Sequence, residues 1–182
     1  MSGHRRSLRL RGYDYRTGGM YFVTICVLGR QCLLGEINNG VTRSNTVGEM
    51  VGDVWNELPR YLGVEIDAFV VMPNHVHGII TLNPVGATPR GCPSANVISP
   101  DIGQALGPAP TFSLSDVVHR FKSLTTARYR NINGHCAGTS DKRLWQRNYY
   151  ERIIRNDDEL NRIREYIRFN PDRWMLDQYY QP

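Results

Sequence analysis

Two histidines, His75 and His77, alternate with an apolar residue inside the hydrophobic run 70–80. This run predicts a β-strand, and residues i and i+2 of a strand point to the same face. The two imidazoles are therefore expected side by side, roughly 7 Å apart at Cα. Neutral imidazole is the commonest metal ligand, so the pair predicts half of a metal site. The alternative is two histidines that are merely hydrogen-bonded on a sheet face.

A third ligand is needed, and His4, His119, His135, the carboxylates and the amides are all candidates. Tyr166 and Asn170 form a suggestive pair because they are four residues apart, which places them on one helix face about 6 Å apart. An amide oxygen can bind a metal, and a phenol can attack a phosphate that a metal polarises. From the spacing alone, a half-buried packing role for Tyr166 is the simpler alternative.

Composition limits the class of protein. The 182 residues suit a single domain, 1–182, and 41% hydrophobic with 21% charged residues is typical of a soluble globular chain. No window approaches the roughly 20 apolar residues that span a bilayer. No apolar stretch follows the basic start, so we expect no signal peptide. Four scattered cysteines without a CxxC pair predict free thiols in a reducing cytoplasm.

Positive charge is concentrated at the start of the chain. Lys plus Arg number 22 against 17 for Asp plus Glu, a net charge of +5. Residues 1–16 form a basic arm that would favour phosphate backbones by releasing counterions, unless it is simply a solvated tail. Its candidate contacts are Arg5, Arg6, Arg9 and Arg11. On the second predicted helix, Arg120 and Lys122 could also contact phosphates, although solvation is the default for each.

The hydrophobic pattern predicts the order β-β-α-β-β-α-β-α. Strands are expected at 20–27, 31–37, 64–72 and 75–82, with a short fifth strand or edge segment at 144–150. Helices are expected at about 46–62, 113–131 and 156–169. Residues 83–110 are rich in Pro, Gly, Ala and Ser and predict a flexible loop within the domain. Hairpins dominate this order, so we expect a mostly antiparallel sheet with packed helices, an α+β domain.

Several motifs together resemble a known family. Residues 72–77, Met-Pro-Asn-His-Val-His, resemble the HUH signature (His, hydrophobic, His) of single-strand DNA nucleases. Residues 144–156 and Tyr166-Ile-Arg-Phe-Asn170-Pro are similar to the single-tyrosine transposases, most of all to the REP-associated tyrosine transposases. Residues 5–15 and 21–24 also fit that branch. The resemblance covers nearly the whole chain apart from the loop 83–110.

This resemblance implies a ferredoxin- or RRM-like HUH fold, with helices on one face and a tyrosine-bearing helix over the histidine face. It implies that His75, His77 and Asn170 bind a divalent cation, Mg²⁺ or Mn²⁺, where transposon-borne relatives usually have Gln in place of Asn170. Tyr166 would attack single-stranded DNA beside a palindromic hairpin, form a 5′-phosphotyrosine link and free a 3′-OH. Reversal would rejoin strands without ATP. Histidine ligands run against the oxygen preference of Mg²⁺, so Mn²⁺ can serve as well.

Other interpretations stay open. The chain could be a non-catalytic, basic nucleic-acid-binding domain with structural histidines, or a zinc hydrolase with another strong third ligand. Tyr149 and Tyr150 compete with Tyr166 as nucleophiles, although packing or base stacking suits them better. Transposon relatives exchange the tyrosine helix between two subunits, whereas the repeat-associated branch can act as a monomer, and we expect a monomer here.

Overall fold

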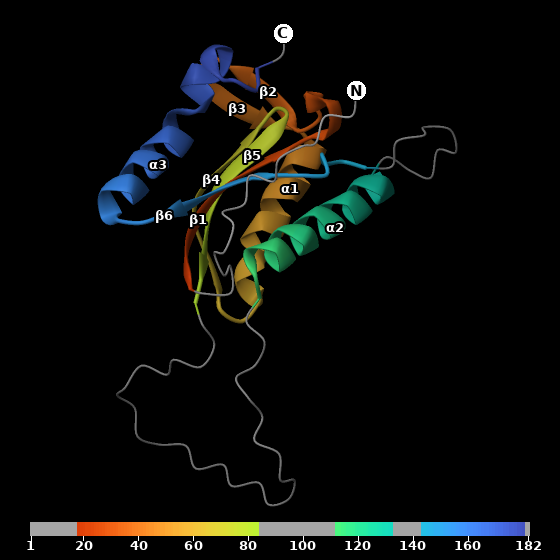
Figure 1. The fold of residues 1–182 in the computed structure, drawn as a ribbon. Coiled ribbons are helices and arrows are strands. Elements are labelled where there is room, and N and C mark those ends of the chain that lie inside the picture. Colours follow the sequence, from red (N-terminus) through yellow and green to blue (C-terminus); the bar gives the residue numbers. More distant parts are fainter. Residues whose placement is uncertain (1–17, 84–111, 133–142, 181–182) are drawn as a thin grey trace, which may run out of the picture.

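The computed structural model describes residues 18–83, 112–132 and 143–180. Its centre is a four-stranded antiparallel sheet in the order β4-β5-β1-β6 (Figure 1). The strands are β1 (Gly19–Cys26), β4 (Val64–Met72), β5 (His75–Leu82) and β6 (Tyr150–Ile154). The predicted α+β class with a mostly antiparallel sheet is confirmed.

The β4–β5 hairpin was predicted from the sequence and carries both histidines. Met72 pairs with His75 across a turn made only of Pro73 and Asn74. Asn74 is fully buried, and its amide donates to the carbonyls of Arg30 and Tyr179 at 3.1 and 2.8 Å. The turn residue therefore ties the hairpin to segments that are distant in sequence, which fixes the end of the strand where His75 begins.

Two helices cover one face of the sheet, α1 (Thr46–Asn56) and α2 (Leu114–Ile132) (Figure 1). The side chain of Asn45 caps α1 by accepting from the backbone N–H groups of Val47 and Gly48. Strand and helix approach closely at Gly78, where a Cβ would overlap the Trp55 indole ring. The main hydrophobic core lies in this layer and contains Val76, Ile80 and Leu82, as the alternation along β5 predicts.

Helix α3 (Asp157–Phe169) lies on the opposite face (Figure 1). A second, smaller core cluster holds it there: Phe22, Ile79, Ile154, Leu160 and Ile167. Asn156 caps the helix by accepting from the Glu159 N–H at 2.9 Å, and Pro171 begins a 3₁₀ segment (Pro171–Leu176) directly after it. The expected placement of a tyrosine-bearing helix over the histidine face is confirmed.

The predicted second strand at 31–37 is wrong in extent and in partner. The observed strand, β2 (Gly35–Asn38), pairs with β3 (Val41–Ser44), which was not predicted, in a separate two-stranded sheet. Gly29 and Arg30 have positive φ and turn the chain away from β1. Asn39-Gly40, also with positive φ, is the hairpin turn that an Asn-Gly pair favours. That signal was present in the sequence.

Two other boundaries also differ from the prediction. The first helix ends at Asn56, and Pro59 lies in a separate 3₁₀ turn, Leu58–Arg60, in agreement with its role as a terminator. The predicted fifth strand at 144–150 lies too early, since β6 begins only at Tyr150. The alternative expectation of an edge segment holds for the residues before it, because Trp145 forms an isolated antiparallel bridge with Val27, just beyond β1. The N–H groups of Leu28 and Gln146 donate to the carbonyls of Leu144 and Cys26 at 2.9 Å, and the Trp145 indole donates to Thr125 Oγ1 at 2.7 Å.

The basic arm 1–16 and, apart from Asn83, the loop 83–110 lie outside the described residues, so both remain predictions. The same holds for the extent of the single domain. Within 18–83, 112–132 and 143–180, no helix combines the length and the apolar character that a membrane crossing requires.

Candidate active site

The two histidines are fully buried and touch each other. His75 is 0% and His77 1% exposed, and their Nε2 atoms lie 2.9 Å apart, so one ring donates a proton that the other accepts. Neighbours fix the remaining nitrogens: His77 Nδ1 is hydrogen-bonded to Thr24 Oγ1 at 2.8 Å and His75 Nδ1 to Asn74 Oδ1 at 2.8 Å. Both Nε2 atoms therefore converge on one point.

Burial keeps this pair neutral. It lowers the pKa of His75 to about 4, against a smaller opposite effect of the Asp177 carboxylate. Burial also lowers the pKa of His77 well below its usual value, and the neighbouring His75 adds to that effect. A neutral imidazole keeps a lone pair for a metal ion, so the surroundings favour the form that can act as a ligand.

Helix α3 brings the predicted tyrosine to the histidines of the same chain. The Tyr166 hydroxyl lies 3.2 Å from His77 Nε2, and its ring meets the edge of Phe22 at 5.9 Å between centroids. Burial raises the pKa of Tyr166 to about 12, with further contributions from Asp177 and Tyr179. The phenol is therefore protonated at neutral pH, although the side chain as a whole is 39% exposed.

Asn170 lies one turn further along, at the C-terminal cap of α3, and is 3% exposed. Its Nδ2 donates to Asp177 Oδ2 at 2.9 Å. Its Oδ1 is buried and has no hydrogen-bond partner among the described residues. A buried amide oxygen without a partner is costly, and a cation would satisfy it.

Asp177 is a site residue that the sequence reasoning did not identify. One of its carboxylate oxygens lies within 4.8 Å of a ring nitrogen of both His75 and His77. Two imidazoles, a carboxylate and an amide oxygen form a donor set suited to a borderline divalent ion such as Mn²⁺. The residues present therefore fit a divalent cation.

Residues 177–179, which follow α3 and its 3₁₀ segment, lie over the histidines and are called the strap below. The Tyr179 ring lies 4.8 Å from the His75 ring, and the Tyr179 N–H donates to Asp177 Oδ1 at 2.7 Å. Arg30 anchors the strap: its guanidinium lies over Tyr179 and donates to the Gln178 carbonyl at 3.3 Å. Beside the strap lies a cavity of about 300 Å³, lined by Tyr166, Asn170, Arg173, Leu176, Asp177 and Gln178.

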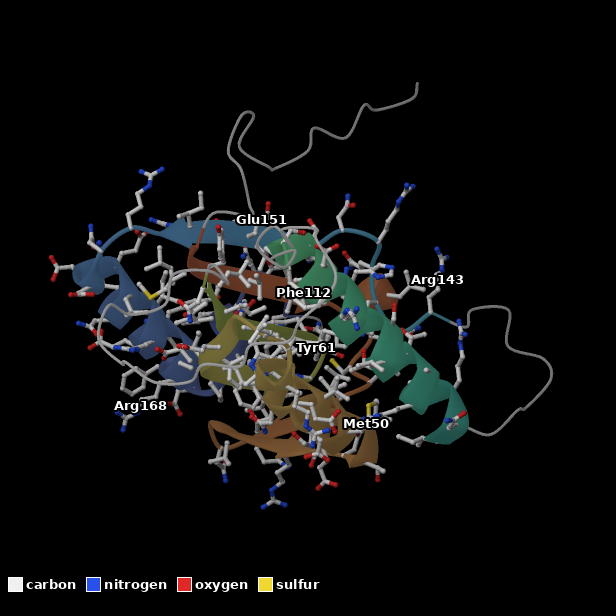
Figure 2. The ribbon with its side chains drawn as sticks, turned by 90° about the horizontal axis from the view of Figure 1, so that it is seen from below. Met50, Tyr61, Phe112, Arg143, Glu151 and Arg168 are labelled. Carbon is white, nitrogen blue, oxygen red and sulfur yellow. The ribbon has the colours of Figure 1, made fainter. Side chains whose placement is uncertain are left out.

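The predicted phosphate contacts on α2 already have partners within the protein. Arg120 stacks over Tyr61 and Phe112, which lie together in Figure 2. Lys122 donates to the backbone carbonyls of residues 146, 147 and 148, and burial lowers its pKa to about 8. Lys122 therefore holds the segment before β6 in place, which charge counting could not reveal.

Alongside α2 there is a basic groove of about 360 Å³. Its lining includes the predicted ligand candidate His119, which the fold does not bring to His75 and His77. Figure 2 shows labelled Arg143, near this groove, far from Arg168 on α3. The groove residues are His119, Lys122, Ser123, Thr126, Ala127, Arg130, Arg143, Trp145, Gln146 and Arg147.

The predicted residues His4, His135, Arg5, Arg6, Arg9 and Arg11 lie outside the described residues.

Comparison with known proteins decides the family. The model of a family described as IS200-like transposase matches residues 104–170, the stretch that contains both α3 and Tyr166. An uncharacterized protein of Haemophilus influenzae is 38% identical over 178 residues, which cover 97% of this chain and 93% of the relative. The chain belongs to the IS200-like transposase family.

The fold of this IS200-like transposase is also found in a solved relative. A REP-associated tyrosine transposase, determined with a bound REP hairpin, matches with a TM-score of 0.54 and 23% identity. The match covers 95% of this chain and 74% of that one. The resemblance seen in the HxH and Tyr-x-x-x-Asn-Pro motifs is thereby confirmed at the level of family and fold.

Proposed function

We propose that this IS200-like transposase is a metal-dependent endonuclease and strand transferase of single-stranded DNA, acting at repeated palindromic hairpins in the cytoplasm. The observation that supports it most is the 3.2 Å contact between the Tyr166 hydroxyl and His77 Nε2 within one chain. A nucleophile beside a cluster of metal-ligating groups is the arrangement that tyrosine-linked cleavage of a phosphodiester requires.

In this proposal His75, His77 and Asn170 hold the divalent cation, with Asp177 as the nearest anion. The convergent Nε2 atoms and the unpartnered Asn170 Oδ1 support this ligand set. When bound, the ion would polarise the scissile phosphate and stabilise the negative charge that develops there. Asn170 Oδ1 supplies an oxygen donor of the kind that Mg²⁺ prefers, while the imidazoles suit Mn²⁺, so either ion can serve.

The reaction that we propose is a transesterification. The Tyr166 oxygen forms a bond to phosphorus, the bond from phosphorus to the 3′ oxygen breaks, and that oxygen takes up a proton as a free 3′-OH. With the ion held at its Nε2, His77 would have no lone pair there to take the phenolic proton. We assign that proton to the Asp177 carboxylate, which lines the same cavity as Tyr166. Attack of a 3′-OH on the phosphotyrosine reverses the reaction, so no ATP is needed.

We further propose that one chain acts as a monomer on hairpin DNA. In support, Tyr166, Asn170 and both histidines come together within one chain, so no partner needs to supply the tyrosine. The solved REP-associated relative was determined with a REP hairpin, which makes a hairpin the substrate to test first. The arm residues 1–16 and the basic groove along α2 are the proposed contacts to its phosphates.

The test measures covalent adducts between protein and DNA on denaturing gels. The probe is a pool of labelled single strands that share one hairpin and carry randomised flanks, with Mn²⁺ or Mg²⁺ present. We expect an adduct with the wild-type protein, none with Tyr166→Phe, and at least a 100-fold slower reaction with His75→Ala or His77→Ala, since loss of a ligand removes the ion.

Tyr61→Phe, on the opposite face of the sheet, is the matched control and should leave adduct formation unchanged. An adduct that persists in Tyr166→Phe would show that another tyrosine is the nucleophile. Sequencing the DNA of the wild-type adducts would also identify the cleavage site.

The basic groove along α2 favours one alternative, a nucleic-acid-binding module without catalysis. Under that alternative the wild-type protein binds the hairpin pool equally well in chelator and in Mn²⁺, and it gives no adduct in either.

A further inference from the structure

A second cavity lies on the other side of Tyr166 from the metal-ligating groups. It is a cleft of about 280 Å³ between the sheet and α3. Phe22 of β1 and Tyr150 of β6 supply aromatic walls, with their rings 6.4 Å apart in an edge-to-face arrangement. Phe22 is nearly buried at 8% exposure, whereas Tyr150 is 39% exposed and forms the open side.

The strand register makes this cleft continuous with the site. Thr24, which is hydrogen-bonded to His77, pairs with His77 on β5 and with Tyr150 on β6. Phe22 pairs with Arg152, and its ring stacks on that of His77 at 5.4 Å. These side chains share one face of the sheet, because each is either paired with the next across neighbouring strands or lies two residues from it along the same strand.

Tyr166 is the residue that both cavities share. Its side chain lines the cavity that contains Asn170 and Asp177, and also the cleft that contains Phe22 and Tyr150. A DNA strand whose scissile phosphate meets the Tyr166 hydroxyl therefore has one cavity on each side of that phosphate. The nucleoside next to the phosphate is the group within reach of the aromatic cleft.

Charge around the cleft suits a nucleotide. Arg152 and Arg162 line it. The guanidinium of Arg152 forms an ion pair with the Glu159 carboxylate, with 2.6 Å between nitrogen and oxygen. The same carboxylate accepts the Arg155 N–H at 3.0 Å, which ties it to the cap of α3. A guanidinium fixed in this way can meet a phosphate oxygen, while the aromatic rings offer a surface to a base.

We infer that this cleft is a nucleoside subsite, in which the unpaired base next to the scissile phosphate stacks on Tyr150. The inference rests on the proposed function, and it adds a residue that determines substrate position. A volume of about 280 Å³ lies just below the usual range for ligand pockets, which suits one base rather than a base pair. The substrate must therefore be single-stranded at this position.

The test uses fluorescence, so that it does not depend on cleavage. The Tyr166→Phe protein, which keeps the ring that lines the cleft, is titrated with hairpin oligonucleotides that carry 2-aminopurine at successive flank positions. Fluorescence of this base falls when it stacks on an aromatic ring. With Tyr166→Phe we expect quenching at one flank position. In the double variant Tyr166→Phe/Tyr150→Ala this quenching should be lost. The double variant should also bind the hairpin roughly 5- to 150-fold more weakly, which is the effect of losing one stacked base.

Two further variants separate stacking from misfolding. Tyr150→Phe, added to the same background, keeps the aromatic face and should restore the quenching. Arg152→Gln should weaken binding and reduce its salt dependence, since the guanidinium held by Glu159 would no longer meet a phosphate. Equal quenching with and without the Tyr150 ring would overturn the subsite. Absence of an adduct with the wild-type protein, together with position-specific quenching, would instead contradict the proposed function alone.

Discussion

Asp177 adds a negative charge to a site whose other metal-ligating groups are neutral. Its carboxylate lies within 4.8 Å of both histidines and accepts a hydrogen bond from Asn170. A negative charge at this distance attracts a divalent cation strongly, because the surroundings are buried and poorly screened. It also raises the pKa of Tyr166, which opposes ionisation of the phenol until a cation offsets the charge.

Replacing Asp177 should therefore weaken metal binding more than it weakens the fold. For Asp177→Asn we expect at least a tenfold lower affinity for Mn²⁺ by isothermal titration calorimetry, and slower adduct formation. Glu165→Gln removes the same charge from an exposed position next to Tyr166 and should change neither quantity. Equal loss of affinity in both variants would mean that net charge, not the position of Asp177, is responsible.

At the residue scale, regular periodicity decided what the sequence could predict. His75 and His77 share a strand face, and Tyr166 and Asn170 share a helix face, so the spacing alone placed each pair together. Asp177 follows a 3₁₀ segment, where no period relates a residue to the site. Arg120 and Lys122 have the charge of phosphate contacts, but their partners come from distant segments.

Among the elements, α3 determines whether the site exists. Its apolar contact with the sheet is a small cluster compared with the core on the opposite face, and two ion pairs, Arg164–Asp67 and Arg152–Glu159, add to it. Its start is fixed by Asn156, which caps the first turn, and by Glu159, which accepts from the backbone of Arg155. Acidic residues in this turn also stabilise the helix, because their negative charges lie at the positive end of its dipole.

Loss of that cap should affect activity as well as stability. Asn156→Ala should lower the free energy of unfolding by about 0.5–2 kcal/mol, measured by urea denaturation. Asn45→Ala removes the equivalent cap from α1 and should cost a similar amount. At a temperature where both variants are folded, only Asn156→Ala should slow adduct formation. Equal rates in the two variants would mean that α3 is positioned by its packing alone.

The sequence predicted the long elements better than the short ones. The β4–β5 hairpin, α2 and α3 carry clear apolar periods and turn or cap residues, and they agree closely with the structure. The strands β2 and β3 have four residues each and expose most of their side chains, so they carry little hydrophobic pattern. Strand β6 was displaced in the prediction because Trp145 and Tyr149 pack into the core without belonging to a strand.

For the molecule as a whole, the buried histidines link folding to pH. The unfolded chain protonates His75 near pH 6.5, whereas the folded protein resists protonation down to about pH 4. Between these values the unfolded state binds more protons, so stability falls as pH falls. Glu57, Asp67 and Glu159 have lowered pKa values and add a similar loss only below about pH 4.5, where unfolded carboxyls protonate.

The window from pH 6.5 to 4.5 therefore isolates the histidines. In chelator, the free energy of unfolding should fall across it by up to about 1.4 kcal/mol per pH unit for each histidine, measured by urea denaturation. His75→Gln should reduce this slope by the contribution of one histidine, about 1.4 kcal/mol per pH unit at most. A flat profile for the wild-type protein would show that the pair can be protonated within the fold.

The sequence distance between Tyr166 and His77 has a consequence for synthesis. The ribosome makes the histidine hairpin 89 residues before the tyrosine that meets it. The sheet strands β4, β5 and β1 can pair, and α1 and α2 can cover them, before α3 has been made. A nascent or truncated chain that stops short of α3 would thus fold much of its core while lacking Tyr166. If Tyr166 is the nucleophile, as we propose, the order of translation keeps unfinished copies from cleaving DNA.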